Sequence, residues 1–155
     1  MSEPIIIWGA GAIGATIGAY LVRNKVQVIF VDADKDHVNE INHSGIQVEG
    51  PIENFKVQAE AMLPHNVKGK YSRIWLCVKA QHTTSTVKQL SGHLSDDGYV
   101  LSLQNGLNEI LISRAVGEAR TLGAFINFGA DYIKPGKIMY GGRGAVVLGE
   151  LDKNE

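Results

Sequence analysis

The sequence predicts an α/β fold with a doubly wound, mostly parallel sheet and an antiparallel β addition at its C-terminal end. Short apolar runs at residues 5–8, 26–31 and 74–78 alternate with segments of helical periodicity. Strands that are apolar along their whole length are typical of a parallel sheet covered on both faces. A glycine-rich segment at residues 9–14 separates the first run from the first helix. From residue 125 onward the helical pattern disappears and β-like runs follow one another, which predicts the antiparallel addition.

The individual elements follow from apolar spacing and from capping residues. The first half is predicted to contain strand 5–8, helix 12–23, strand 26–31, helix 34–44 and short strands 46–48 and 55–59. Asp34 is suited to cap the second helix and Gly45 to end it. The second half is predicted to contain strand 74–78, helix 83–94, strand 99–103, helix 107–116 and strands near 122–128, 137–140 and 145–148.

Length and composition indicate one globular domain. The chain has 155 residues and a mass of 16.8 kDa, of which 45% are hydrophobic and 20% charged. A net charge of −1 and a pI near 6.5 leave no positive excess for a phosphate backbone, so no nucleic-acid partner is expected. The single cysteine, Cys77, excludes an intrachain disulfide and fits a cytoplasmic protein.

The charge-free stretch at residues 4–22 has the length of a membrane-spanning helix. Four glycines interrupt it, and each costs about 1 kcal/mol relative to alanine in a helix. Its first part is β-branched and ends at a glycine, as a buried strand does. The polar residues 2–4 also lack the basic start of a signal peptide. We therefore expect no contact with a membrane.

The segment GAGAIG is the strongest local indication of function. It follows a β run, opens a helix, and is followed by Asp32 at the end of the next strand, as in Rossmann-like dinucleotide-binding domains. Gly9 permits a tight turn, Gly11 lets the backbone approach a pyrophosphate, and Gly14 allows close helix–strand packing. The helix start offers unpaired N–H groups to the phosphates. The predicted cofactor-binding residues of this loop are Gly9, Ala10, Gly11, Ala12, Ile13 and Gly14.

Asp32 lies where a carboxylate accepts hydrogen bonds from the adenosine ribose hydroxyls. A 2′-phosphate would meet this charge, with Asp34 and Asp36 close in sequence and only Lys35 to offset them. One unit-charge repulsion at about 4 Å is on the order of 4 kcal/mol before relaxation. The sequence therefore predicts that NAD is favoured over NADP.

Two further candidate sites follow predicted strands, where open α/β sheets bind their ligands. Val78 and Lys79 follow one strand, and Asn105 and Gly106 follow the next. The Lys79 ammonium and the Asn105 amide are suited to contact a nicotinamide, a ribose or an anionic substrate in one crevice. The spacing equally fits a solvated lysine and a turn that needs positive φ at Gly106.

No metal site is predicted. His37 and His43 are six residues apart, off the spacing of a helical zinc pair, and His65, His82 and His93 are scattered. Cys77 lies in an apolar run and is expected to be a buried, unreactive thiol.

GAGAIG, IWLCVKAQHT and LSLQNGLNE, in this order and spacing, resemble the N-terminal half of the ketopantoate reductase (2-dehydropantoate 2-reductase) family. The similarity covers nearly all 155 residues. It implies reduction of a small 2-keto acid, ketopantoate to (R)-pantoate, with a nicotinamide cofactor in pantothenate synthesis. It also implies that Lys79 and Asn105 contact cofactor and substrate. Many members carry an arginine after the second strand for the NADP 2′-phosphate, whereas this chain reads Asp32-Ala33-Asp34.

The resemblance further implies that the catalytic lysine and the substrate-orienting acid belong to a helical C-terminal domain beyond this chain. Residues 1–150 would form the dinucleotide-binding domain and residues 151–155 the start of a linker. No residue of this chain is thus assigned as certainly catalytic, and the chain alone is expected to show little turnover. The face left by that domain could pair two copies as a homodimer.

Two other functions stay open at this point. One is a stand-alone NAD-sensing module of the kind that gates potassium channels, which would need no polar group near a substrate carbonyl. The other is the cofactor domain of a different two-domain dehydrogenase, such as the mannitol phosphate type, to which residues 29–32 bear a faint similarity.

Overall fold

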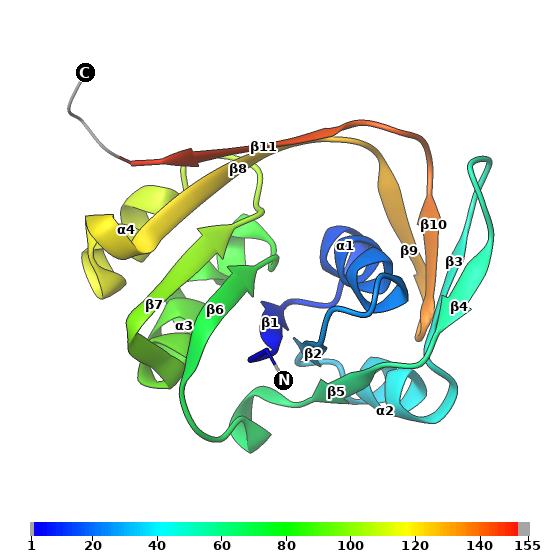
Figure 1. Cartoon of the computed structure of the whole chain (residues 1–155), viewed down its shortest axis with the longest axis horizontal. Helices are drawn as coiled ribbons and strands as arrows, with labels where there is room; N and C mark the ends of the chain where they lie inside the picture. Colours follow the sequence, from blue (N-terminus) through cyan, green and yellow to red (C-terminus); the bar gives the residue numbers. More distant parts are fainter. Residues whose placement is uncertain (1, 152–155) are drawn as a thin grey trace.

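The computed structural model describes residues 2–151, and its centre is a seven-stranded sheet in the order β11-β8-β7-β6-β1-β2-β5 (Figure 1). All neighbours in this sheet are parallel except β11, which runs antiparallel to β8 at the edge. The prediction of a mostly parallel sheet with an antiparallel edge is thereby confirmed. The strands are β1 (Ile5–Trp8), β2 (Val28–Val31), β5 (Glu60–Met62), β6 (Tyr71–Leu76), β7 (Leu94–Ser102), β8 (Thr121–Asn127) and β11 (Ala145–Glu150).

Two pairs of helices pack on opposite faces of this sheet. α1 (Ala12–Arg23) and α2 (Lys35–Ser44) share one apolar core with those side chains of β1 and β2 that point to their face of the sheet. α3 (Thr83–Leu90) and α4 (Glu109–Val116) share the core on the other face. Single-turn 3₁₀ helices occur at Pro64–Asn66, Ala80–His82, Ser91–His93 and Glu118–Arg120. Within residues 2–151, none of the helices has the length and apolar character needed to cross a membrane.

A second sheet, which the sequence analysis did not anticipate, packs on the far side of α1 (Figure 1). It has the order β4-β3-β10-β9. Its strands are β3 (Ile46–Glu49), β4 (Phe55–Val57), β9 (Ala130–Lys134) and β10 (Lys137–Tyr140). The segments 121–134 and 137–150 are the two arms of one long hairpin that turns at Pro135–Gly136 and joins both sheets. The sequence pattern also missed β5 and β9 as separate strands.

Several predicted boundaries are exact and others are wrong by a few residues. β1, α1 and β10 match their predicted bounds. β2 begins two residues late because Lys25 adopts φ 63° and Val26 still closes the preceding turn. The helix predicted at 83–94 ends at Leu90, since a 3₁₀ turn follows and Leu94 already belongs to β7. α4 begins at Glu109 rather than at 107.

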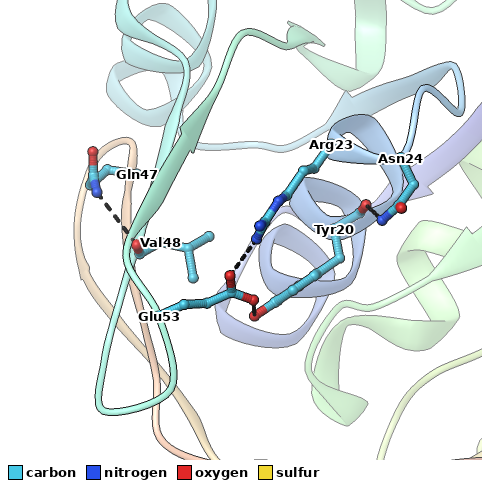
Figure 2. A network of polar contacts seen from close by, with 6 residues as sticks. All are labelled: Tyr20, Arg23, Asn24, Gln47, Val48 and Glu53. Atoms are coloured by element: carbon cyan, nitrogen blue, oxygen red, sulfur yellow. Dashed lines mark hydrogen bonds and ion pairs between the residues drawn. The ribbon is translucent and has the colours of Figure 1, made fainter.

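The helix α1 is tied to the second sheet by a polar cluster (Figure 2). Glu53, in the loop between β3 and β4, accepts hydrogen bonds from the Tyr20 hydroxyl at 2.8 Å and from Arg23 at 2.5 Å. The Tyr20 ring packs edge-on against Phe55 at 4.9 Å. Burial, with the hydrogen bond to Glu53, raises the pKa of Tyr20 to about 12. Because α1 carries the glycine-rich loop at its start, this cluster helps to fix the loop against both sheets.

Candidate functional site

The glycine-rich loop connects β1 to α1, and two of its glycines are required by the fold. Gly9 has φ +105°, and a Cβ there would lie 2.7 Å from the backbone nitrogen of Val78. A Cβ at Gly14 would lie 2.0 Å from the carbonyl oxygen of Gly9 and 3.1 Å from Ile7. The tight turn and the close helix–strand contact expected at these positions are therefore present.

Gly11 differs from Gly9 and Gly14 because the fold does not require a glycine at this position. A Cβ on Gly11 would meet no atom within 4 Å. The residue is the N-cap of α1, which has no side-chain cap and no acidic residue in its first turn. The first helical hydrogen bond runs from the Ala15 N–H to the Gly11 carbonyl, so the preceding N–H groups have no helical partner. The helix start thus presents donors and a positive dipole end to open space, which suits a phosphate group.

Asp32 lies directly after β2 and fixes the loop from the side. Its Oδ2 accepts a hydrogen bond from the Ala10 N–H at 2.8 Å, and its Oδ1 accepts one from the Asp34 N–H at 2.9 Å. Each oxygen keeps further acceptor capacity for a ligand hydroxyl. Asp34 caps α2 by accepting from the Asp36 and His37 N–H groups, as the sequence predicts.

A cavity of about 660 Å³ lies at the carboxyl ends of β1, β2 and β6. Gly9, Gly11, Asp32, Val78 and Lys79 all line it, so the structure brings these predicted residues together. The strand order reverses at β1, and open α/β sheets bind their ligands at such a point. The other predicted loop residues, Ala10, Ala12, Ile13 and Gly14, do not line the cavity.

Asn105 and Gly106 lie outside this cavity. They line a separate one of about 460 Å³, together with Leu107, Phe125 and Val147. Lys79 and Asn105 thus line different cavities in this structure, and their contact with one shared ligand stays a prediction. Gly106 has φ +91°, so the turn needs a glycine whatever else it does.

His37 adjoins this site, although its sequence context predicts only a structural role. Its side chain is buried, and its Nδ1 accepts a hydrogen bond from the Gly136 N–H at 3.0 Å. Its Nε2 must then carry the proton, which it donates to the Ala10 carbonyl at 2.6 Å. Ala10 is thus held by Asp32 through its N–H and by His37 through its carbonyl. The i, i+4 spacing of His37 with the buried Ile41 was the one signal of burial in the sequence.

The electrostatic surroundings of the cavity are negative near Asp32. Burial, together with the carboxylates of Asp34, Asp32 and Asp36, raises the pKa of Tyr132, whose ring packs edge-on against His37 at 5.0 Å. No arginine is among the residues that line the cavity, whose basic side chains are Lys79 and His82.

The remaining candidate groups of the chain are its single thiol and its potential metal ligands. Burial raises the pKa of the Cys77 thiol, so it stays neutral at ordinary pH and is a poor nucleophile. Within residues 2–151, no three His, Cys, Asp or Glu side chains lie close enough to hold a metal ion together.

Comparison with known proteins agrees with this geometry. The family described as "Ketopantoate reductase PanE/ApbA" matches residues 5–153. The 2-dehydropantoate 2-reductase of Pyrococcus abyssi (strain GE5 / Orsay) is 34% identical over 147 residues, covering 94% of this chain and 47% of the relative. That of Archaeoglobus fulgidus (strain ATCC 49558 / DSM 4304 / JCM 9628 / NBRC 100126 / VC-16) is 31% identical over 152 residues, covering 97% and 48%.

Solved structures of related enzymes have the same fold as this chain. A ternary structure of D-mandelate dehydrogenase with NADH and anilino(oxo)acetate superposes with a TM-score of 0.88 at 25% identity, covering 97% of this chain and 49% of that one. The 2-dehydropantoate 2-reductase from Geobacter metallireducens GS-15 gives 0.86 at 26% identity, covering 97% and 51%. The chain spans about half the length of the curated relatives it matches. With a family match across nearly the whole sequence and the glycine loop, Asp32 and Lys79 gathered at one cavity, this chain belongs to the ketopantoate reductase family.

Proposed function

We propose that this chain is the nicotinamide-dinucleotide-binding part of a 2-keto-acid reductase. One observation carries the proposal: the cavity at the carboxyl ends of β1, β2 and β6 combines an uncapped helix start, a positioned carboxylate and a lysine. In such an enzyme the nicotinamide, when bound, supplies the hydride that reduces a ketone. Family membership favours this function over a stand-alone NAD sensor.

Each residue of the cavity has a distinct part in this proposal. The pyrophosphate would bind at the start of α1, where Gly11 leaves room for it and the N–H groups of residues 12–14 have no partner within the helix. Asp32 accepts from the ribose hydroxyls with the acceptor capacity that Ala10 and Asp34 leave unused. Gly9 and Gly14 shape the loop. Ile13 contributes the N–H group of the second residue of α1.

The nicotinamide half extends from there toward the loops after β6 and β7. Val78 and Lys79 line the cavity on this side, so the Lys79 ammonium is placed to contact the nicotinamide ribose or an anionic substrate. Asn105 and Gly106 would border the substrate from the neighbouring loop once the cleft is completed by further chain. This order of groups follows the rule that a dinucleotide lies across the carboxyl ends of the strands.

The cofactor we propose is NAD rather than NADP. Asp32, Asp34 and Asp36 create the negative potential that acts on Tyr132, and a 2′-phosphate would add two more negative charges there. The cavity lining offers no arginine to offset this repulsion.

The remaining part of the enzyme would be a second domain that completes the cleft, and the substrate a small 2-keto acid such as ketopantoate. Catalytic groups of that domain are needed for turnover, because a ketone requires a proton donor beside its oxygen and exclusion of water. We place the protein in the cytoplasm. Alternatively, two copies of this chain would form a homodimer through the surface that the second domain would otherwise cover.

Calorimetric titration of the 155-residue chain with NADH and NADPH tests the proposal. We expect saturable binding of NADH and binding of NADPH at least about tenfold weaker, as one unfavourable charge contact would cause. An Asp32→Asn variant keeps the size of the side chain and should narrow this difference. Tighter binding of NADPH than of NADH would overturn the cofactor preference, and no binding of either would overturn the function.

A further inference from the structure

We propose that the buried side chains of Gln104, Thr83 and Asn108 are positioning residues that couple the Lys79 loop to the Asn105 turn. The inference rests on the proposed function, in which these two segments contact the nicotinamide half of the cofactor and the substrate. The coupling sets where Lys79 and Asn105 stand relative to each other, although the two line different cavities.

The two segments leave the sheet side by side. β6 and β7 are parallel neighbours, with Leu76 opposite Ser102 in the register. The Leu103 N–H donates to the Leu76 carbonyl at 2.9 Å, which extends the pairing one residue beyond β7. Beyond that point the backbones separate, and side chains make the connections between them.

These connections form one chain of hydrogen bonds between backbone carbonyls. The Gln104 amide donates to the Val78 carbonyl at 2.7 Å and to the Thr83 hydroxyl at 2.8 Å. The Thr83 hydroxyl donates to Asn108 Oδ1 at 3.1 Å. The Asn108 amide then donates to the Asn105 carbonyl at 2.8 Å. One end of the chain is thus the residue before Lys79, and the other is Asn105 itself.

The direction of every bond in this chain is determined. Gln104 uses both amide hydrogens, and its Oε1 accepts from the Ser102 hydroxyl at 3.2 Å. Reversing this amide would place its oxygen against the Val78 carbonyl. Since Gln104 donates to Thr83, the single hydroxyl proton of Thr83 is free to go to Asn108. A network with one consistent set of donors holds its members in one geometry.

Burial makes the network costly to break. Thr83 and Ser102 are fully buried, and Gln104 and Asn108 are each 6% exposed. A buried polar group that loses its partner cannot regain a hydrogen bond from water, so its loss destabilises the arrangement. Thr83 and Asn108 line neither cavity, so they do not contact a ligand there and act through the backbone of Lys79 and Asn105.

The test compares two ligands on the intact chain. NADH reaches the Lys79 end of the cavity, whereas ADP, which lacks both the nicotinamide and its ribose, occupies the part beside the glycine loop and Asp32. Thr83→Val keeps the shape and removes the hydroxyl. We expect it to weaken NADH binding about tenfold while ADP binding stays within about twofold. Thr83→Ser, which restores the hydroxyl, should bring NADH binding back.

Two further variants make the experiment decisive. Thr121→Val removes another buried hydroxyl, which donates to the Gly117 carbonyl at the opposite end of the parallel strands, and should change neither affinity. Asn108→Asp keeps the acceptor for Thr83 but loses the donor to Asn105, and it should reproduce the loss for NADH if Thr83→Val does not fold.

The outcomes separate this inference from the proposed function. Equal loss of both ligands, or unchanged NADH affinity in Thr83→Val and Asn108→Asp, would overturn the positioning role while the dinucleotide site stands. A wild-type chain that binds neither NADH nor ADP would overturn the proposed function, and the positioning role with it.

Discussion

The three glycines of the GAGAIG loop have different reasons to be glycine. Gly9 and Gly14 are required by the chain itself, because a Cβ on either would collide with backbone atoms. Gly11 has no such requirement, since a Cβ there would point into open space. A glycine that the fold does not need, at the uncapped start of a helix, is best explained by a ligand that approaches the backbone.

This difference predicts opposite effects for matched substitutions. Gly11→Val should leave the thermal unfolding temperature nearly unchanged and abolish measurable NADH binding, because its side chain would occupy the place of the pyrophosphate. Gly14→Val should lower the free energy of unfolding by about 3 kcal/mol or more through its clash with the Gly9 carbonyl. Differential scanning calorimetry measures the stability of the two variants, and titration with NADH measures their affinity. NADH binding by Gly11→Val at wild-type affinity would contradict the assignment of Gly11.

Ala10 shows how side chains from two other elements hold the glycine-rich loop in place. Its N–H is bound by Asp32 and its carbonyl by His37, whose other nitrogen accepts from Gly136 in the turn of the long hairpin. Both peptide groups that flank the second loop position are thereby fixed. The glycine-rich loop is anchored to α2 and to the second sheet as well as to its own strand.

At the scale of elements, α1 lies between the two sheets and is held at both of its ends. Its start packs through Gly14 against β1, and a Cβ at Gly18 would lie 2.3 Å from the Phe30 ring of β2. Near its end, Tyr20 and Arg23 bind Glu53 of the β3–β4 loop (Figure 2). The hydrogen bonds from Arg23 and Tyr20 hold the pKa of the Glu53 carboxyl below its ordinary value of 4.5.

The lowered pKa of Glu53 predicts a pH-dependent part of the stability. A carboxyl with a depressed folded-state pKa stabilises the fold above its unfolded pKa, and this contribution is lost as the pH falls through the folded-state value. Glu53→Gln should therefore lower the urea midpoint slightly at pH 7, and the difference from wild type should shrink below about pH 4.5. Urea unfolding between pH 7 and pH 3 measures it.

A suitable control is Glu118→Gln, which replaces an exposed carboxylate in the last 3₁₀ turn. Its difference from wild type should stay small and show no comparable trend with pH. If the difference in urea midpoint caused by Glu53→Gln stays the same down to pH 3, the charge of Glu53 does not account for its contribution to stability.

At the scale of the whole molecule, the edge formed by β8 and β11 is apolar on both faces. One cavity of about 490 Å³ lies on the α1 side and includes Trp75, whose indole N–H is buried without a partner among the described residues. The second, of about 460 Å³, lies beside Asn105. Leu148, which is 60% exposed, lines both. Strands apolar on both faces are typical of buried positions, and the relatives are about twice as long as this chain.

This surface predicts strong binding of an apolar dye. The fluorescence of 1-anilinonaphthalene-8-sulfonate should rise with the folded chain, and Leu148→Glu should reduce it about twofold or more, because the charge disrupts both cavities. Ile133→Glu is the matched control: Ile133 is 47% exposed on β9 and lines neither cavity, so it should have little effect. Equal reduction of the fluorescence by both variants would mean that the dye binds to exposed apolar side chains in general and not to these cavities.

The sequence by itself determined the alternation of strands and helices, the bounds of β1, α1 and β10, and the glycine loop with Asp32. These depend on local patterns: apolar runs, capping residues and glycines at a fixed spacing from a strand. Lys79 lines the cavity because it follows a strand whose direction the pattern reveals.

Only the tertiary structure decided the features that join distant segments. The second sheet requires β10 to pair with β3, the role of His37 requires Gly136 to reach it, and the link between Thr83 and Asn108 requires two loops to meet. That Lys79 and Asn105 line different cavities is likewise visible only in the folded chain. Hydrogen bonds and burial between residues far apart in the chain leave no periodic trace in the sequence, because each partner alone fits many other environments.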